Sequence, residues 1–406
     1  MAIEIPFSPP RMDQKIIDEV VDTLKSGWIT TGPKTKLFEK KLTEYAGHKA
    51  TLCVSSGSAG LELMLRWFGV SEGDEVIVPA YTYSATANVV LHCGAKPVMV
   101  DIGDDFNIDV SRIRDAITPR TKVIIPVDLA GYPCDYDEMN ALVRDGEMIA
   151  LFKPATPEQE KLGRILVLSD AAHSIGATYK DKRSGNLTDI TVFSFHAVKN
   201  LTTAEGGAVC LNLPAPFDNE KEYQDLCIKS LHGQTKDAFT KTQIGQWRYD
   251  VIEAGYKFNM TDIQAAMGLV ELERYDSDML VRRREIFDQY TDAFSRYPWA
   301  QAPVYENRDK KSSYHVYLLR IRDINEETRD QIMKSIFSKG VAVNVHFIPL
   351  PLLNHYRNMG YCIAEYPVSH DSFKREISLP VYYDLDHEKV KKVIDAVVES
   401  VEENLR

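Results

Sequence analysis

Short β-branched runs alternate with amphipathic stretches between about residues 50 and 212. The expected strands are 51–54, 75–78, 97–101, 122–127, 165–170, 190–195 and 208–211. The expected helices between them include 60–68, 84–93, 110–117 and 135–143. Strands that alternate with helices in this way form crossover units. The pattern therefore predicts an α/β fold with a largely parallel sheet and helices on both of its faces.

Two further amphipathic stretches precede this region. One face of the first carries Ile16, Ile17, Val20, Val21 and Leu24, and one face of the second carries Leu37, Phe38, Leu42 and Tyr45. Gly27 is expected to end the first helix, because glycine readily adopts the left-handed conformation that follows a helix. The segment Gly-Trp-Ile-Thr-Thr-Gly-Pro at 27–33 combines bulky apolar residues with turn formers, which is unusual for a simple linker.

The alternation ends after residue 213, and the remaining chain predicts a smaller α+β domain. Residues 261–297 are expected to form one long helix that bridges the two domains. Its expected buried positions are Ile263, Ala266, Met267, Val270, Leu272, Met279 and Ile286. A strand at 314–321, a helix at 326–338, a strand at 341–347 and a helix at 387–402 are expected to follow. We therefore divide the chain into 1–260, the N-terminal segment with the large domain, and 261–406, the bridging helix with the small domain.

Residues 144–164 are polar and contain two prolines. Such a stretch between a helix and the next strand is typical of a surface loop. We expect it to be a surface excursion without a part in the functional site.

Charge and composition exclude several classes of function. The 59 acidic residues outnumber the 48 basic ones, so the net charge is −11 and attraction to a nucleic-acid backbone is not expected. Runs of 18 apolar residues and a basic start followed by an apolar stretch are both missing, so neither a membrane span nor a secretion signal is expected. The six cysteines are scattered without a CxxC pair, which predicts reduced thiols and no metal site. A cytoplasmic protein is expected.

Unusual residues stand where predicted strands end, which is where open α/β sheets bind their ligands. The segment Ser-Ser-Gly-Ser-Ala-Gly at 55–60 lies between a strand and a helix. Its small residues would allow backbone N–H groups and a helix N-terminus to bind an anion. The alternative is a tight turn in which Ser58 caps the helix.

Asp170 ends an apolar strand and is followed by Ala-Ala-His173. A buried carboxylate is unfavourable by several kcal/mol unless a cation or strong donors meet it. Asp170 could serve as a helix cap or take part in chemistry, and this residue alone favours neither.

Lys199 follows the next predicted strand, which also carries Ser194 and is followed by His196 and a Thr/Gly-rich turn. A single loop lysine is usually solvated. An amine, a buried acid and an anion-binding turn are, however, the three groups that pyridoxal phosphate (PLP) requires. The amine forms a Schiff base with the aldehyde, the acid pairs with the pyridine nitrogen and the backbone binds the phosphate. The residues therefore predict a PLP site.

Several segments together resemble the DegT/DnrJ/EryC1/StrS family of PLP enzymes, which are mostly nucleotide-sugar aminotransferases. They are 27–33, the Ser-Gly-Ser-Ala turn, Val-Pro-Ala-Tyr-Thr-Tyr-Ser-Ala-Thr at 78–86, Asp-Ala-Ala-His at 170–173, Phe-Ser-Phe-His-Ala-Val-Lys-Asn-Leu-Thr-Thr at 193–203, Gly-Tyr-Lys-Phe-Asn-Met-Thr-Asp at 255–262 and Ser-Leu-Pro at 378–380. The resemblance extends over essentially the whole chain. It implies a type I PLP-dependent aminotransferase fold, with a large domain around a mostly parallel sheet and a smaller C-terminal α+β domain.

The resemblance also implies roles for the cofactor-binding residues. Lys199 would be the Schiff-base lysine and Asp170 the partner of the pyridine nitrogen. His173, a position that is more often Gln in the family, would lie by the ring hydroxyl. Tyr83 would stack on the ring, although core packing is an alternative for an aromatic residue. The phosphate would bind Ser194 Oγ and the backbone of Gly57 and Ser58.

Asn259 resembles the family residue that reaches the phosphate from the neighbouring subunit. If Asn259 has this role, the protein is a homodimer with composite active sites. Residues that border the sugar site in relatives correspond to Thr30, Thr31, His315 and His346. Each of these four could equally be a packed or surface polar residue.

The expected reaction moves an amino group from L-glutamate to a nucleotide-linked keto-deoxysugar, for cell-surface polysaccharide or related amino-sugar biosynthesis. PLP and its amine form, pyridoxamine phosphate (PMP), would alternate. One alternative is a PMP-dependent sugar dehydratase of the same family, which the retained Lys199 opposes. Another is a non-catalytic regulatory protein, which the complete set of Lys199, Asp170, Ser194 and Asn259 opposes. The sugar, the nucleotide and the choice between 3- and 4-amination stay open.

Overall fold

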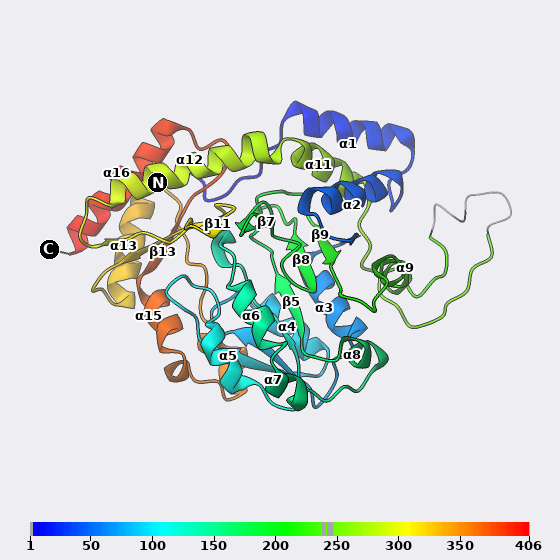
Figure 1. The fold of residues 1–406 in the computed structure, drawn as a ribbon. Helices are drawn as coiled ribbons and strands as arrows, with labels where there is room; N and C mark the ends of the chain where they lie inside the picture. Colours follow the sequence, from blue (N-terminus) through cyan, green and yellow to red (C-terminus); the bar gives the residue numbers. More distant parts are fainter. Residues whose placement is uncertain (1–2, 238–240, 242–246, 406) are drawn as a thin grey trace.

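The computed structural model describes residues 3–237, 241 and 247–405, so Met1 and Ala2 of the start lie outside it. A seven-stranded sheet lies at the centre of the larger part of the molecule (Figure 1). Its strands are β1 (Ala50–Val54), β2 (Glu75–Pro79), β3 (Lys96–Val100), β4 (Thr121–Ile124), β5 (Leu166–Asp170), β8 (Ile190–Ser194) and β9 (Gly207–Leu211). All seven predicted strands of this region are confirmed.

The sheet order is β1-β9-β8-β5-β4-β2-β3. The pairs among β2, β3, β4, β5 and β8 are parallel, whereas β9 runs antiparallel to both β1 and β8. The prediction of a largely parallel sheet is therefore confirmed. Because parallel strands end at the same edge, the carboxyl ends of β5 and β8 bring Asp170 beside Val192, two residues before Ser194.

Helices pack around this sheet. They are α3 (Gly57–Trp67), α4 (Ala85–His92), α5 (Val110–Ala116), α6 (Tyr136–Leu142), α7 (Gly146–Leu151), α8 (Pro157–Leu162) and α9 (Asn219–Lys229). The stretch 144–164 contains α7 and α8, so the predicted surface excursion is partly helical, and most of its residues are exposed or half-buried. Thr156 caps α8, Gly163 ends it, and Met148 and Phe152 are buried in the core. Figure 1 shows α7 at the lower end of the ribbon near α5, whereas α8 lies at the lower right, where Thr156 and Gln159 bond Phe68 O at the end of α3.

Two helices precede the sheet, as expected: α1 (Gln14–Ser26) and α2 (Pro33–Ala46). Gly27 ends α1 in the left-handed conformation, with φ at 75°, and its N–H donates to Leu24 O, which confirms its predicted role. Helix α1 buries Ile16, whereas Ile17 and Leu24 of the predicted apolar face are exposed.

The expectation of a single helix at 261–297 is wrong in one respect. This stretch consists of α11 (Asp262–Glu273), a π-helical turn (Tyr275–Met279) and α12 (Leu280–Phe294). Arg274 leaves helical geometry at φ −110° and ψ 4°, and its side chain forms ion pairs with Asp13 and Glu271. Ala266, Val270, Leu272, Met279 and Ile286 are buried as predicted, whereas Ile263 and Met267 are half-buried.

The carboxyl-terminal part forms the expected smaller α+β layer. It contains β10 (Ala300–Gln301), β12 (Tyr317–Ile321), β13 (Glu376–Leu379), α13 (Glu326–Ser338), α14 (Asn354–Asn358), α15 (Pro367–Arg375) and α16 (His387–Asn404). A third small sheet joins β11 (Lys310–Lys311) to β6 (Thr178–Tyr179) and β7 (Lys182–Arg183). The strand predicted at 341–347 is wrong, because only Val341 and Asn344 form bridges there, to Ile5 and Ser378.

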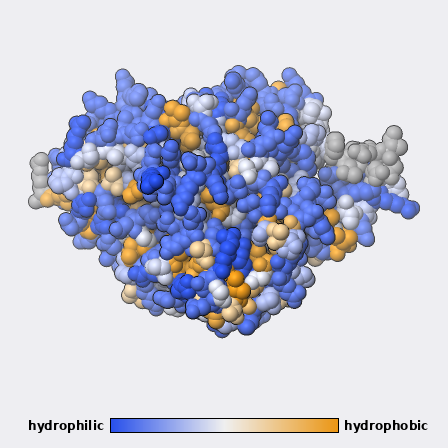
Figure 2. Space-filling view, in the orientation of Figure 1, coloured by the Kyte–Doolittle hydropathy of each residue, from blue (hydrophilic) through white to orange (hydrophobic). Residues whose placement is uncertain are grey.

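The two parts have separate hydrophobic cores. The larger surrounds the central sheet, and the smaller packs α12, α13 and α16 around β12 and β13. Ile5 belongs to the smaller core although it lies near the N-terminus. The division at residue 260 stays a prediction. Within the described residues, no helix is long and apolar enough to cross a membrane, and Figure 2 shows a mostly hydrophilic face with scattered small apolar patches.

Candidate active site

The turn between β1 and α3 forms an anion cradle with the end of β8. Ser56, and not Ser58, caps α3: its Oγ accepts the Ala59 N–H at 3.0 Å. The interpretation of Ser58 as the cap is therefore wrong. Gly57 and Ser58 are the first residues of this helix, so their N–H groups have no acceptor within it. A Cβ on Gly57 would lie 3.0 Å from the Ser194 Cβ, so the structure brings the predicted phosphate ligands Gly57, Ser58 and Ser194 together.

Gly207 on β9 permits this close approach. A Cβ at this position would lie 2.7 Å from the Gly57 nitrogen and 2.8 Å from the Phe193 carbonyl oxygen. Any side chain here would push the turn away from the sheet. The predicted Thr/Gly-rich turn thus has a steric role next to the cradle.

Asp170 is buried at the end of β5 and is held by neutral donors. Thr86 Oγ1 donates to Oδ2 at 2.9 Å, and the Ala172 N–H donates to Oδ1 at 3.2 Å. Burial raises the pKa of Asp170, against the lowering effects of these two hydrogen bonds and of Lys199. The carboxylate retains acceptor capacity for one more donor, as a pyridinium N–H would provide.

Lys199 lies beyond the end of β8 and is half-buried. Loss of water around the ammonium lowers the pKa of Lys199 to about 8, while the nearby Asp170 acts in the opposite direction. A lysine with this pKa is far more often neutral near pH 8 than an ordinary lysine with a pKa near 10.4. Lys199 is therefore prepared to act as a nucleophile and as a base.

His173 is buried, and its hydrogen-bond partner defines its tautomer. The Ala130 N–H donates to Nδ1 at 3.2 Å, so the proton of the neutral ring is assigned to Nε2. Burial, followed by the charge of Lys199, lowers the pKa of His173 well below its usual value, so the ring is neutral. His173 can therefore donate a hydrogen bond from Nε2, as the predicted contact with a ring hydroxyl requires.

His315 stacks against His173, with the ring centroids 4.2 Å apart, and has the opposite tautomer. The Asn200 amide donates to Ser313 O at 2.7 Å, which directs its oxygen toward His315 Nδ1, also at 2.7 Å. Nδ1 of His315 must therefore carry the proton, and Nε2 has a free lone pair. Burial lowers the pKa of His315 as well, so this ring is also neutral.

Tyr83 and His346 flank the same region through Phe347. Three rings surround the Phe347 ring. Their centroids lie 4.9 Å (His346), 5.6 Å (Tyr83) and 6.0 Å (His173) from the Phe347 centroid. Tyr83 is 61% exposed, which leaves one ring face available for stacking and makes the alternative of core packing wrong. The structure thus brings His315, His346 and Tyr83 together with Lys199 and Asp170.

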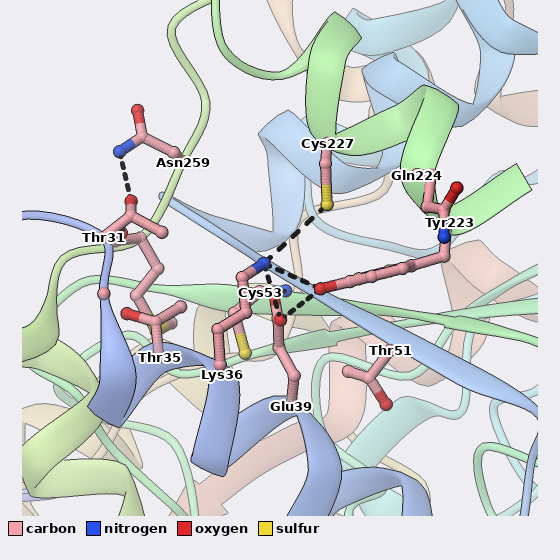
Figure 3. Close-up of polar contacts among 12 residues, drawn as sticks. Thr31, Thr35, Lys36, Glu39, Thr51, Cys53, Tyr223, Gln224, Cys227 and Asn259 are labelled. Atoms are coloured by element: carbon pink, nitrogen blue, oxygen red, sulfur yellow. Dashed lines mark hydrogen bonds and ion pairs between the residues drawn. The ribbon is translucent and has the colours of Figure 1, made fainter. Parts of the chain in front are cut away.

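Thr31 and Asn259 form a second group near the cradle (Figure 3). Asn259 Nδ2 donates to Thr31 Oγ1 at 2.6 Å, and Thr31 Oγ1 donates to Met260 O at 2.5 Å. Asn259 also bridges to Val54 at the end of β1, close to the turn before Gly57. Within one chain, Asn259 therefore lies beside the strand that leads into the cradle.

Helix α2 is attached to the neighbouring strand and helix through Glu39, which is buried (Figure 3). Its carboxylate accepts the Cys53 N–H of the edge strand β1 at 2.9 Å and the Tyr223 O–H of α9 at 2.7 Å. Lys36 pairs with the same carboxylate at 3.1 Å. The contacts fix α2 against β1 and cover the free edge of the sheet.

The chain matches the DegT/DnrJ/EryC1/StrS aminotransferase family over residues 10–156 and 158–398. The chain belongs to this family. The aminotransferase is 37% identical over 398 residues to the spore coat polysaccharide biosynthesis protein SpsC of Bacillus subtilis, covering 97% of this chain and 96% of SpsC. The fold class and the enzyme class expected from the sequence are thereby confirmed.

Solved structures support the same assignment. The PMP form of Spr1654 from Streptococcus pneumoniae superposes with a TM-score of 0.95 at 46% identity, over 99% of this chain and all of that chain. PseC of Helicobacter pylori, an aminotransferase involved in the biosynthesis of pseudoaminic acid, superposes with a TM-score of 0.86 at 29% identity, over 98% and 100% of the two chains. Spr1654 is also known in a PLP form, with a TM-score of 0.94. The aminotransferase uses PLP.

The residues present fit this cofactor. In the cradle, the first N–H groups of α3 are free, and Gly57 has no side chain that would press against Ser194. Asp170 is a buried acceptor, and its two hydrogen-bond donors are both neutral. Lys199 carries an amine near Asp170. Sequence reasoning missed Thr86 and Asn200, which hold Asp170 and His315. Thr86 and Asn200 both lie in segments that resemble the family, 78–86 and 193–203, but only the fold shows which side chain each one contacts.

Proposed function

We propose that this aminotransferase transfers the amino group of L-glutamate to the keto carbon of a nucleotide-linked keto-deoxysugar. The observation that carries the proposal is the placement of Lys199, Asp170 and the Gly57-Ser58-Ser194 cradle at one edge of the sheet. SpsC is named for polysaccharide biosynthesis and PseC for pseudoaminic acid biosynthesis, which supports a sugar acceptor. The amino sugar would serve a cell-surface polysaccharide or a related product.

The geometry of the site supports the following cofactor-binding roles. Gly57, Ser58 and Ser194 would hold the phosphate, Asp170 the pyridine nitrogen and His173 Nε2–H the ring hydroxyl. Tyr83 would cover one face of the ring. PLP supplies an electron sink that stabilises negative charge at the carbon next to the transferred nitrogen.

The chain itself supplies the proton transfer. Lys199, with its pKa lowered to about 8, can take a proton from the substrate carbon and return it as a general acid. From its buried position, Asp170 would keep the pyridine nitrogen of the bound cofactor protonated. His315, with a lone pair on Nε2, would accept a hydrogen bond from the substrate.

Thr30, Thr31, His315 and His346 are proposed to border the sugar. The Thr31 hydroxyl already bonds Met260 O and Asn259, so Thr31 would shape the pocket through this group. Thr30 O accepts the Asp262 N–H at 3.1 Å, and the Asp262 carboxylate in turn accepts the Gly32 N–H at 2.8 Å. These bonds explain why the segment 27–33 is more than a linker.

We place the reaction in the cytoplasm. All six cysteines are free, and four of them are buried, which fits a reducing compartment.

The purified enzyme, incubated with amine-labelled L-glutamate, is expected to aminate one of a panel of UDP-, dTDP- and GDP-linked keto sugars. The label should appear in the sugar product, and 2-oxoglutarate should form in equal amount, both measured by mass spectrometry. Lys199→Ala protein is the control. Loss of oxygen from the sugar without gain of nitrogen would support the dehydratase instead, and absence of any glutamate-dependent spectral change would contradict the proposed donor.

We further propose a homodimer in which Asn259 serves the cofactor of the neighbouring subunit. Mixing inactive Lys199→Ala and Asn259→Asp subunits should then restore activity, because one site of each mixed dimer carries both intact residues. Random exchange should yield about a quarter of the wild-type activity, since half of the dimers are mixed and half of their sites are intact. The introduced carboxylate repels the phosphate, which is why Asp is chosen.

Mixing Lys199→Ala with Asp170→Asn subunits is the matched control. Both residues serve the same chain's site, so each mixed site keeps one defect and no activity should return. Tagged subunits would establish by pull-down that exchange occurs. Exchange without recovery in the Asn259→Asp mixture would place Asn259 in its own chain's site or outside the site.

A further inference from the structure

A buried carboxyl group lies behind His346, away from the cofactor-binding residues. Glu376 begins β13 and has no exposed surface. Its Oε1 accepts the Ser378 Oγ–H at 2.6 Å, and its Oε2 accepts the His346 backbone N–H at 3.1 Å. Ser378 Oγ also lies 2.9 Å from His346 Nδ1. Glu376, Ser378 and His346 thus form an unbroken chain of hydrogen bonds.

The far end of this hydrogen-bond chain lies next to residues of the proposed active site, because His346 is near enough to Lys199 to feel its charge and contacts Phe347, which also contacts His173. Among the described residues, His346 Nε2 has no hydrogen-bond partner, and the ring borders a cavity of about 20 Å³ that Val198 and His315 also line. Phe7 stacks on the ring with centroids 5.4 Å apart and keeps its orientation. Burial, followed by the charge of Lys199, lowers the pKa of His346 to about 3. The ring is therefore neutral and stores no proton by itself.

Two directions of hydrogen bonding are available to this chain. When Glu376 is ionised, Ser378 donates to Oε1, so Ser378 must accept from His346 Nδ1–H and Nε2 is bare. When Glu376 is protonated, its proton lies on Oε1, because Oε2 already accepts the His346 N–H. Oε1–H then donates to Ser378, Ser378 donates to Nδ1, and the His346 proton moves to Nε2. The charge of Glu376 therefore sets the tautomer of His346.

We propose that Glu376, Ser378 and His346 form a proton-transfer chain, in which a proton taken up at His346 Nε2 in the active site is stored on Glu376. For an amine substrate, the N–H bond of the ammonium breaks and an Nε2–H bond forms. Nδ1–H passes its proton to Ser378 Oγ, and the Ser378 hydroxyl proton passes to Glu376 Oε1. The ammonium becomes a neutral amine and the carboxylate becomes a carboxylic acid, so charge and atoms balance. The reverse sequence returns the proton.

The surroundings give Glu376 a suitable affinity for a proton. Burial raises the pKa of Glu376 to about 8, against the lowering effects of Ser378 and the His346 N–H. An aminotransferase must deprotonate an ammonium group at neutral pH before the nitrogen can attack, and an acceptor that titrates near this pH is well matched to that task. The charged or titratable groups around Glu376 and His346 are Arg329 of α13, Arg320 of β12, Tyr81, Lys199, His173 and His315.

The inference rests on the proposed placement of His346 in the active site, but not on the identity of the donor or the sugar. Ser378 and Glu376 act through His346 and are positioning residues. The test therefore reads the tautomer of His346 directly in the cofactor-loaded protein, by ¹⁵N NMR of histidine-labelled enzyme. The His346 signals are assigned by their loss in His346→Gln.

The wild-type protein is expected to change from Nδ1–H to Nε2–H as the pH falls through about 8. Glu376→Gln should show Nε2–H at every pH, because its amide oxygen accepts the His346 N–H and its NH₂ group must donate to Ser378. Ser378→Ala should abolish the pH dependence, and Ser378→Thr, which keeps the hydroxyl, should restore it. A wild-type tautomer that does not change between pH 6 and 9 would overturn the inference.

Kinetics supply the second readout. Glu376→Gln and Ser378→Ala are each expected to lower kcat by about 10- to 100-fold with little change in KM, as the loss of a general base does. Ser378→Thr should recover most of that loss. If Ser378 has a purely structural role, Ser378→Ala should give less folded protein, and the enzyme that does fold should have a normal kcat. This result would refute the proposed proton-transfer chain. An enzyme that aminates none of the sugars but shows the tautomer change of His346 would count against the proposed substrate. It would not count against the proton-transfer chain of Glu376, Ser378 and His346.

Discussion

Lys199→Ala is expected to lower transamination by at least ~1,000-fold, because one side chain supplies both the nucleophile and the proton shuttle. The fold should persist. The site lowers the pKa of Lys199, so the folded state disfavours the charged amine. Removal of this amine therefore eliminates a contribution that destabilises the folded protein at neutral pH. Activity, absorbance of bound cofactor and thermal unfolding of the cofactor-free proteins would be measured together.

Lys391→Ala is the matched control, since Lys391 is an exposed lysine of α16. It should keep wild-type activity and colour. Borohydride reduction of the wild-type enzyme should fix the cofactor on the peptide that contains Lys199. Cofactor attached to a different lysine would refute the assignment of Lys199.

Asp170→Asn is expected to retain some cofactor and to lose at least ~100-fold in activity, comparable to the loss of one preorganised electrostatic partner. A neutral amide cannot keep the pyridine nitrogen protonated, so the carbanion loses its electron sink. The local structure should tolerate the change. The amide oxygen can still accept the Ala172 N–H, and the Thr86 hydroxyl can turn to accept from the new NH₂ group.

The same variant should alter the titration of Lys199 in the cofactor-free protein. Asp170 raises the pKa of Lys199, so its neutralisation should lower that pKa below about 8. Because only the neutral amine is acylated, the midpoint of Lys199 labelling by an amine-reactive reagent should shift to lower pH. Mass spectrometry of the Lys199 peptide would follow the labelling. Near-normal turnover, or an unchanged midpoint, would mean that another acid occupies this position.

Local signals in the sequence account for the predicted elements that the structure confirms. Gly27 ends α1 because only a residue that tolerates positive φ fits there, and the helix at 326–338 agrees residue for residue with α13. The failures have non-local causes. Residues 341–347 have strand-like composition but find only single bridging partners, Ile5 and Ser378, and Arg274 breaks the long helix where it pairs with Asp13.

The candidate site divides in the same way. Lys199, Asp170 and the turn at 55–60 could be predicted because each stands at or shortly after the end of a strand, and parallel strands end at one edge. Thr86, Asn200 and Glu376 could not be predicted, because their roles depend on partners far along the chain. Thr86 and Asp170 are 84 positions apart, and Asn200 and His315 are 115.

The sequence by itself determined the strand and helix pattern, the family and the identity of the chemical groups at the strand ends. Periodicity, capping residues and motifs act within a few residues of one another, so they can be recognised without a fold. Only the tertiary structure decided which nitrogen of His173 and which nitrogen of His315 carries the proton. The Ala130 N–H and the Asn200 side chain select these tautomers, and packing alone brings these partners into hydrogen-bonding distance.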